Sequence, residues 1–385
     1  MGPGGESLRR PGRLKHGPAA NPLTTLHESH IALSTEDRNA VLPDPRPAAL
    51  QTAADEAALE AQLGRALEAG DDATVRSTLA LPAHSVRAAR LLSAAIDRRG
   101  EGIGLRFFAI PLVIVAGARN RLTVAGAIPE LHVLRGLLEQ HGAIGVTRNF
   151  GLGNALVSAE ALDSLSPSAL WRAAADPAQR APFDALQPEP IAVTGSREQV
   201  HLRFLVGAGV TPQHLPSFLE SASNIGTWGM PFTRELARQL AQPGLEILPM
   251  PRPPQPLTQA AHAGRRALLE AALSLFLGNT LRKFRMAVGD PEAVLSAHRL
   301  DSGAGELRLS LSTPFDDSLF EGYVWPLQPQ DDVAEVSRLL HEALNECRVP
   351  SVTVVPQVLP ERLAGGAVFV AGRMLGDLGR ASASH

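Results

Sequence analysis

The sequence predicts an α+β fold of repeated α-β-β-α-β units, in the ferredoxin-like (split βαβ) arrangement, behind an N-terminal helical segment. Two observations carry this prediction. Apolar runs with strand periodicity alternate with amphipathic helical stretches through most of the chain. A junction from a strand into a helix, found at 121–141, recurs at 203–219 and more loosely at 321–344. We expect these three junctions to be copies of one structural joint.

The same patterns divide the chain into segments. The N-terminal arm is rich in Pro, Gly, Ser and Arg, and its few apolar residues cannot offset the entropy of ordering it. The expected segments are a disordered arm (1–52), a helical segment (53–100), three α+β units (101–157, 158–250 and 264–375), a proline-rich connector (251–263) and a disordered tail (376–385).

The helical segment begins with leucines that recur every four residues, at Leu59, Leu63 and Leu67, and therefore share one helix face. Asp71 or Asp72 is expected to cap a second short helix. A third helix should run from Ser85 to about Arg99. Its inward face is expected to hold Val86, Ala89, Leu92 and Ile96.

The first α+β unit opens with an almost wholly apolar stretch at 105–117. A strand of this kind is buried on both faces and is central in its sheet. We expect 121–125 to return as its antiparallel partner. A helix should begin near Pro129, a third strand is expected at 143–150, and the Gly-Leu-Gly-Asn sequence at 151–154 reads as a loop.

The second unit is expected to contain a helix at 158–175 and a hairpin that pairs 191–195 with 199–207. Further helices are expected at 212–224 and 231–241, before a strand at 245–250.

The third unit begins with a helix at 264–286, which places Leu269, Leu273, Phe276, Thr280 and Phe284 on one side. The remaining elements are an antiparallel pair (306–312 and 320–326), a helix (331–346), a closing strand (351–356) and an edge strand (366–372).

Composition restricts the function classes. The chain has 36 basic and 39 acidic residues, for a net charge of −3, which argues against a general binder of nucleic acid or anionic membranes. Lys15 and Lys283 are the only lysines, a bias typical of a high-GC bacterial genome. The single cysteine, Cys347, excludes an intrachain disulfide and fits a reducing cytoplasm. The longest apolar run, at 107–118, is too short to span a bilayer.

No motif in the sequence stands out as catalytic, and no cofactor or metal is predicted. His214 is the first catalytic candidate, because a helix N-terminus favours a neutral imidazole there. Arg203 and Asp317 are the other catalytic candidates. The candidates for ligand binding are Arg148, Asn149, Asn154, Gly207 and Gly209.

Two of these regions have simpler explanations. The Gly-Ala-Gly-Val-Thr-Pro sequence at 207–212 resembles a nucleotide-binding turn but lacks its third glycine, so tight strand-to-helix packing is the better interpretation. Asp316, Asp317, Asp331 and Asp332 could form a cation site, but turn formation and helix capping require the same residues.

Two functional hypotheses follow. The first is a non-catalytic regulatory or scaffolding protein of the cytoplasm that binds a partner protein, a copy of itself or a small ligand of unknown identity. The second is an enzyme that acts on a small polar or anionic molecule where the strand-to-helix junctions converge. A nucleic-acid adaptor that uses Arg282, Lys283 and Arg285 is a weaker alternative, because cations at that helix end complement the dipole.

Overall fold

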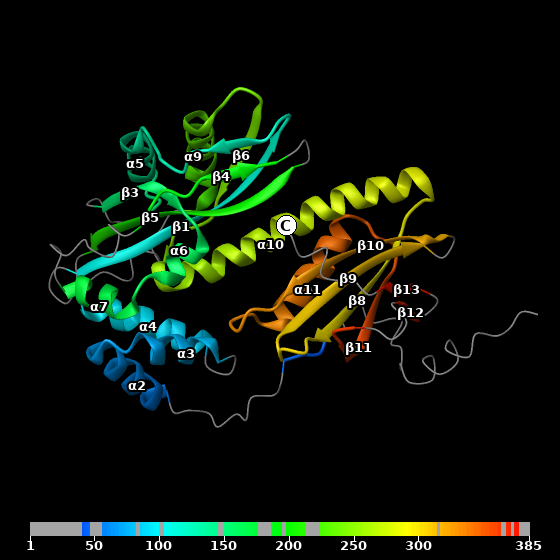
Figure 1. Ribbon diagram of the computed structural model, residues 1–385, viewed down its shortest axis with the longest axis horizontal. Helices are drawn as coiled ribbons and strands as arrows, with labels where there is room; N and C mark the ends of the chain where they lie inside the picture. Colours follow the sequence, from blue (N-terminus) through cyan, green and yellow to red (C-terminus); the bar gives the residue numbers. More distant parts are fainter. Residues whose placement is uncertain are drawn as a thin grey trace, which may run out of the picture.

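The computed structural model describes most of the chain from residue 41 onwards. The described residues are 41–46, 56–81, 85–99, 104–144, 150–175, 186–194, 198–211, 224–313, 316–362, 367–370 and 373–376. The protein is a mixed α+β structure with two larger sheets, and one long helix runs between them (Figure 1). The disorder predicted for 1–52 and 376–385 falls on residues outside the described ranges, except at 41–46 and at Gly376. Residues 41–46 are ordered and bury Leu42, contrary to the prediction.

The N-terminal helical segment consists of α2 (Glu56–Ala69), α3 (Asp72–Ala80) and α4 (Ser85–Arg99). Leu59, Leu63 and Leu67 are buried in one core, as the four-residue spacing predicts. Asp71 caps α3 by accepting a hydrogen bond from the backbone of Thr74. The prediction for Val86 is wrong, because this side chain is 63% exposed at the start of α4.

The first sheet is built around a 15-residue central strand, β1. Its strands are β1 (Gly104–Ala118), β3 (Phe150–Val157), β5 (Gln199–Thr211), β6 (Leu245–Pro251) and the short β7 (Gln255–Pro256). The order is β3-β5-β1-β6, all pairs are antiparallel, and β7 also pairs with β1. The prediction that the apolar stretch at 105–117 is a central strand is therefore confirmed. Residues assigned to the first two predicted units share this one sheet.

Both hairpins predicted for these units are wrong. The strand β2 (Leu122–Val124) does not return along β1 but pairs with β4 (Ile191–Val193). The strand β5 pairs with β1 on one side and with β3 on the other. Because β5 and β6 occupy the two edges of β1, the strand that follows β1 through a short turn cannot pair with it.

Two glycine-containing stretches predicted as turns lie within strands. Residues 151–154 belong to β3, which has a register shift against β5 between Leu152 and Leu156. Gly207 and Gly209 lie inside β5, which continues past the predicted end at 207 to Thr211. Most of the helix predicted at 212–224 lies outside the described residues. A side chain at Gly207 would collide with the ring of Phe108 and with the carbonyl of Gly151. Close packing between strands explains the glycine at 207.

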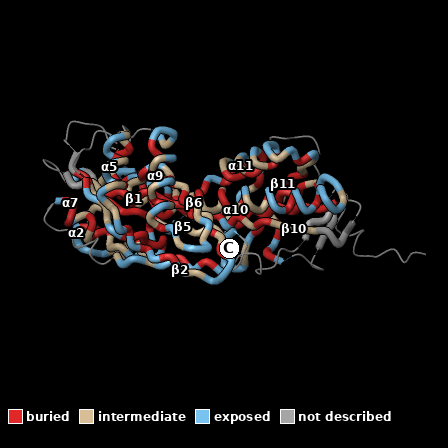
Figure 2. Tube along the Cα trace, turned by 90° about the horizontal axis from the view of Figure 1, so that it is seen from above, coloured by how far each residue is buried: buried red, intermediate tan, exposed pale blue. Residues whose placement is uncertain are grey.

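Helices cover both faces of the first sheet. On β1, Phe108 and Ile110 face the helices α5 (Leu131–Gln140) and α9 (Ile225–Leu240), and Phe107 and Ala109 face the opposite side. That opposite side is covered by α4, α6 (Ala159–Ser164), α7 (Pro167–Ala175) and the first turns of α10. In Figure 2 the trace through β1 is accordingly buried. The single helix predicted at 158–175 is split into α6 and α7, because Pro167 starts a new helix.

The long helix α10 (Leu257–Ala287) belongs to both halves of the molecule. Leu257 and Ala260 lie in the core beneath the first sheet, and Leu273 and Leu277 lie in the core of the second sheet. The helix begins at Leu257 directly after Pro256, earlier than the predicted start at 264. Figure 1 shows it running diagonally from α6 to the second sheet.

The second sheet has four strands in the order β10-β9-β8-β11, and β11 is parallel to β8. The strand β8 was not predicted. It places three strands before α11 and breaks the α-β-β-α-β order of the third unit, so the predicted ferredoxin-like repeat is not confirmed. The elements of this half are β8 (Glu292–Arg299), β9 (Gly305–Thr313), β10 (Asp316–Pro326), α11 (Val333–Glu346), β11 (Val352–Pro360), β12 (Ala367–Val370) and β13 (Arg373–Gly376).

Among the described residues, no helix is both long enough and apolar enough to cross a membrane.

Candidate functional site

A pocket of about 400 Å³ lies where the helical segment, the first sheet's helices and the second half of the molecule meet. We call it the junction pocket. Its walls come from α3, α4, α6, α7, the first turns of α10 and the turn before α11. The lining residues are Arg76, Leu79, Ala80, Leu92, Leu162, Asp163, Leu165, Pro167, Leu170, Leu257, Thr258, Ala261, His262, Arg265, Gln328, Pro329 and Gln330.

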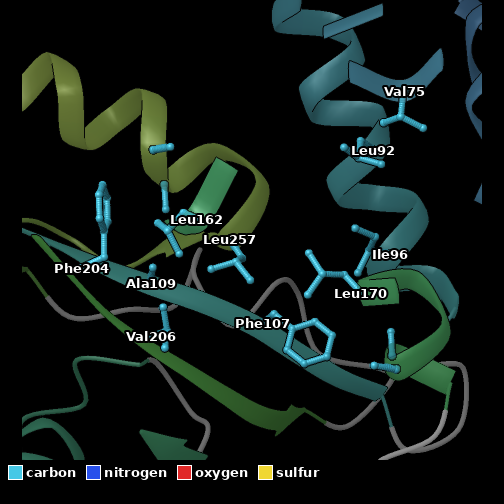
Figure 3. Packing of buried hydrophobic residues seen from close by; sticks show 14 of the residues in the cluster. Val75, Leu92, Ile96, Phe107, Ala109, Leu162, Leu170, Phe204, Val206 and Leu257 are labelled. Carbon is cyan, nitrogen blue, oxygen red and sulfur yellow. The ribbon is translucent and has the colours of Figure 1, made fainter. Parts of the chain in front are cut away.

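The floor of the junction pocket is apolar because it is formed by side chains of the hydrophobic core that packs against the first sheet. Leu92, Leu162, Leu170 and Leu257 come from four different helices and belong to one buried cluster (Figure 3). Each of these helices presents one apolar face to the first sheet, and the cavity remains where their ends do not close together. An apolar floor of this kind binds the hydrocarbon part of a ligand.

The polar side of the pocket is one face of α10. Thr258, His262 and Arg265 are spaced three or four residues apart, so they project from the same face of the helix. The hydroxyl oxygen of Thr258 is buried and has no hydrogen-bond partner in the structure. A hydroxyl can both donate and accept a hydrogen bond.

His262 faces the turn before α11 with both ring nitrogens. Its Nδ1 lies 3.3 Å from Oε1 of Gln328, and its Nε2 lies 3.8 Å from Oδ1 of Asp331. The Asp331 side chain is 1% exposed, and its Oδ2 accepts a hydrogen bond of 2.8 Å from the backbone of Gln328. Its Oδ1 is buried without a hydrogen-bond partner. The polar wall therefore holds a histidine oriented beside a buried carboxylate.

The rim of the pocket carries two arginines and one aspartate. Arg265 forms an ion pair with the Asp163 carboxylate. Arg76 donates to the carbonyl oxygens of Ser164 and Leu165 at 3.3 and 3.0 Å. The lining thus holds two guanidinium groups and one carboxylate, and this excess of positive charge leaves the rim net positive.

The turn 328–331 forms the far wall and is held from two directions. Arg46 donates to the carbonyl oxygens of Gln328, Pro329 and Asp331 at 2.9, 3.3 and 3.0 Å. The Ser85 hydroxyl donates to the carbonyl of Pro329 at 2.8 Å. This wall depends on contacts with residues that are distant in the sequence.

An ion pair next to the pocket holds α11 to α10. Arg266 of α10 lies 2.8 Å from the carboxylate of Glu335 on α11. The hydrogen bond from Arg266 holds the pKa of Glu335 below its usual value. This contact fixes the distance between the polar face of α10 and the helix that follows the turn.

The residues predicted as a site do not line the junction pocket. Asn154, Gly207 and Gly209 lie together on the neighbouring strands β3 and β5. Arg203 lies further along β5, where it donates to the carbonyls of Leu202 and Pro190 at 2.8 and 2.9 Å. Burial lowers its pKa.

Other predicted residues fall outside the part that can be described. Arg148, Asn149 and His214 lie outside the described residues, and so does the side chain of Asp317, whose backbone belongs to β10. Asp332 caps α11 by accepting a hydrogen bond from Ala334, as helix capping requires. Within the described ranges, no group of three or more His, Cys, Asp or Glu residues could hold a metal ion.

A second polar cluster lies on one face of the second sheet. Ser296 and His298 are fully buried, and the Ser296 hydroxyl lies 2.9 Å from Nε2 of His298. The Nδ1 of His298 lies 2.9 Å from the carbonyl of Pro360, and Arg308 donates to Glu306 beside it. Both nitrogens of His298 have partners and neither is open to solvent, so this cluster is a structural network.

The chain was compared with protein-family models, with curated proteins and with solved structures, and none of the three comparisons gives a match.

Proposed function

We propose that the protein is a non-catalytic binding protein that takes a small amphipathic molecule in the junction pocket. The observation that carries this proposal is the pairing of an apolar floor with an unsatisfied polar atom on one wall. The hydroxyl of Thr258 is buried without a hydrogen bond, and such a group is stabilised when a ligand supplies the partner. A volume of about 400 Å³ suits a small molecule.

The charge of the rim indicates the head group of the ligand. Arg76 and Arg265 line the pocket with positive charge, and Asp163 is the one carboxylate in the lining. A carboxylate or another small anion would meet a positive rim, while its hydrocarbon chain would cover the leucines of the floor. We expect a medium-chain carboxylate such as decanoate to bind more tightly than decanol or decylamine.

Calorimetric titration of the full-length protein with these three compounds tests the proposal. Ala80 lines the pocket from the exposed end of α3, so Ala80→Trp can fill the cavity without disturbing the core. Ala73→Trp, on the same helix and also exposed, is the matched control. Decanoate should bind the wild type and the Ala73→Trp variant but not Ala80→Trp. No heat of binding with the wild type, or equal binding by both variants, would contradict the proposal.

An enzyme acting on a small polar or anionic molecule is the second candidate. It is supported by His262, which lies between Gln328 and the buried Asp331 on the same helix face as the Thr258 hydroxyl. A histidine oriented by a carboxylate is a general base when a substrate proton lies within reach. Turnover of an ester of decanoic acid that is lost in His262→Gln, with binding retained, would favour this candidate.

For the fold, we infer that the first sheet is a ferredoxin-like unit. When the additional elements β2, α6, α7 and β4 are set aside, the order β1-α5-β3-β5-α9-β6 and the strand order β3-β5-β1-β6 support a split βαβ arrangement. An experimental structure in which α5 and α9 covered opposite faces of this sheet would contradict the inference.

A further inference from the structure

Residues Val41–Arg46 lie against the second sheet, away from the helix α2 that follows them in the sequence (Figure 1). Their contacts are with α11, with the end of β9 and with the turn 328–331. We call this segment the latch and the surface beneath it the latch groove.

Leu42 is the apolar anchor of the latch. Its side chain is 2% exposed and belongs to the same core as Val336 and Leu340 of α11. Its backbone N–H donates to the hydroxyl of Ser337 at 3.3 Å. One side chain and one backbone group are thus recognised together, as in the docking of an extended peptide.

Pro45 fills a site that is shaped by a glycine. A Cβ atom at Gly305 would lie 2.6 Å from Cγ of Pro45 and 3.1 Å from Cγ of Arg46, so any other residue at 305 would displace the latch. The carbonyl of Pro45 accepts a hydrogen bond of 2.7 Å from Nε of Arg299.

Arg46 supplies the polar anchor. Its side chain is 13% exposed, and its guanidinium donates to three carbonyl oxygens of the turn 328–331. The Asp44 carboxylate accepts from Nε of Arg46 at 2.9 Å and from its backbone N–H at 2.9 Å, which orients the guanidinium before it reaches the turn. A lysine could not make this fan of hydrogen bonds, because it lacks the planar fork.

We propose that the latch groove is a recognition site for an extended Leu-Pro-Asp-Pro-Arg segment, and that Val41–Arg46 occupies it as an exchangeable ligand of the same chain. Two prolines limit the conformations of the free segment, so little entropy is lost when it docks. The contacts are concentrated at three side chains, as at interfaces where a few residues carry most of the binding energy.

A labelled peptide of the sequence Val-Leu-Pro-Asp-Pro-Arg tests the groove by fluorescence anisotropy on the full-length chain. In the wild type the tethered latch has an effective concentration of roughly millimolar and excludes the peptide. A full-length variant carrying Leu42→Ser and Arg46→Ala should bind the peptide at least about tenfold more tightly than the wild type. A control peptide with lysine in place of the arginine should bind that variant about tenfold more weakly. Equal binding to both proteins, absence of binding to the variant, or no preference between the peptides would overturn the proposal.

Hydrogen exchange of the wild type provides a measurement that does not depend on the variant. The Leu42 amide should be protected relative to a free peptide, yet exchange faster than the amides of Leu295 and Leu309 in the second sheet. Protection equal to that of the sheet would mean that the latch opens only on global unfolding. An unprotected Leu42 would mean that it does not dock. Either result contradicts an exchangeable latch.

Docking of the latch should also be coupled to ligand binding in the junction pocket, because Arg46 holds the turn 328–331, which lines that pocket. This expected coupling rests on the proposed function. Decanoate should raise the protection of the Leu42 amide in wild type but not in Ala80→Trp. If decanoate fails to bind, the proposed function fails while the peptide result still decides the groove. If decanoate binds and leaves Leu42 unchanged, the coupling alone is wrong.

Discussion

Arg265 lies at the mouth of the junction pocket, where it pairs with Asp163 and adds to the positive charge of the rim. If the ligand is a carboxylate, Arg265→Gln should raise its dissociation constant roughly threefold to tenfold, because one charged hydrogen bond is lost. Decanol should bind the variant and the wild type equally. The matched control is Arg172→Gln, an exposed arginine of α7 outside the lining. Calorimetry would contradict the expectation if both variants weakened decanoate alike.

Asp44 should make the docking of the latch sensitive to acid. Burial raises its pKa, but hydrogen bonds from Arg46 and the charges of Arg46 and Arg299 outweigh burial, so the pKa lies below the ordinary value of 3.8. A carboxyl whose folded pKa is depressed stabilises the folded state above its unfolded pKa, and the stabilisation is lost as the pH falls through the folded pKa. The latch should therefore loosen below about pH 4.

Hydrogen exchange at Leu42, corrected for intrinsic rates, measures this effect. Protection in the wild type should be constant near neutrality and fall in acid. In Asp44→Asn it should be lower at neutral pH and change little with pH. Unchanged wild-type protection down to about pH 3, with the sheets still folded, would refute a role for Asp44.

The residues of the candidate site show why the site could not be predicted from the sequence. The lining runs from Arg76 to Gln330, and these residues meet only through the packing of helices from distant segments. One signal was present in the sequence: Thr258, His262 and Arg265 share a helix face with leucines and alanines around them. The sequence prediction placed a connector over 251–263, which concealed this face.

At the scale of elements, the local sequence predicts the burial of a strand but not its pairing partners. The periodicity of β1 correctly predicts a central buried strand, because burial on both faces is a property of its own residues. Its partners β5 and β6 lie far along the chain, and the nearby β2 pairs elsewhere. Local turn signals do not encode that choice. The strand β8 was overlooked because Ser296 and His298 interrupt its apolar character, although both are buried in the polar network of the second sheet.

Two glycines of α10 should respond to alanine in opposite directions. At Gly264 a Cβ would lie 2.5 Å from Cζ of Phe204 and 3.0 Å from Cδ1 of Leu202, so Gly264→Ala should destabilise the fold by about 1–3 kcal/mol. At Gly278 nothing lies within 4 Å, so Gly278→Ala should stabilise it by about 0.5–1 kcal/mol through helix propensity. Chemical denaturation measures both. Equal effects at the two positions would mean that the packing of α10 on β5 does not control the outcome.

For the whole molecule, the shared helix α10 predicts that both sheets unfold together. Trp228 lies in the core of the first sheet and Trp325 in the core of the second, and both are fully buried. Fluorescence of two variants, each retaining one of these tryptophans as its only one, should report coincident denaturant transitions. Leu277→Ala, which removes a contact in the second core, should shift both transitions by about 2–5 kcal/mol. Separate midpoints would mean that α10 does not join the halves into one cooperative unit.

The position of the latch in the sequence determines when it can dock during synthesis of the chain. The Leu42 amide and its Ser337 partner are 295 residues apart, so the ribosome releases the anchor long before the groove exists. At about 5–20 residues per second, translation needs roughly 15–60 s to complete the groove. During that interval Leu42 has no core to enter. Docking of Val41–Arg46 must therefore follow the completion of α11, which places latch closure among the last steps in the biogenesis of this protein.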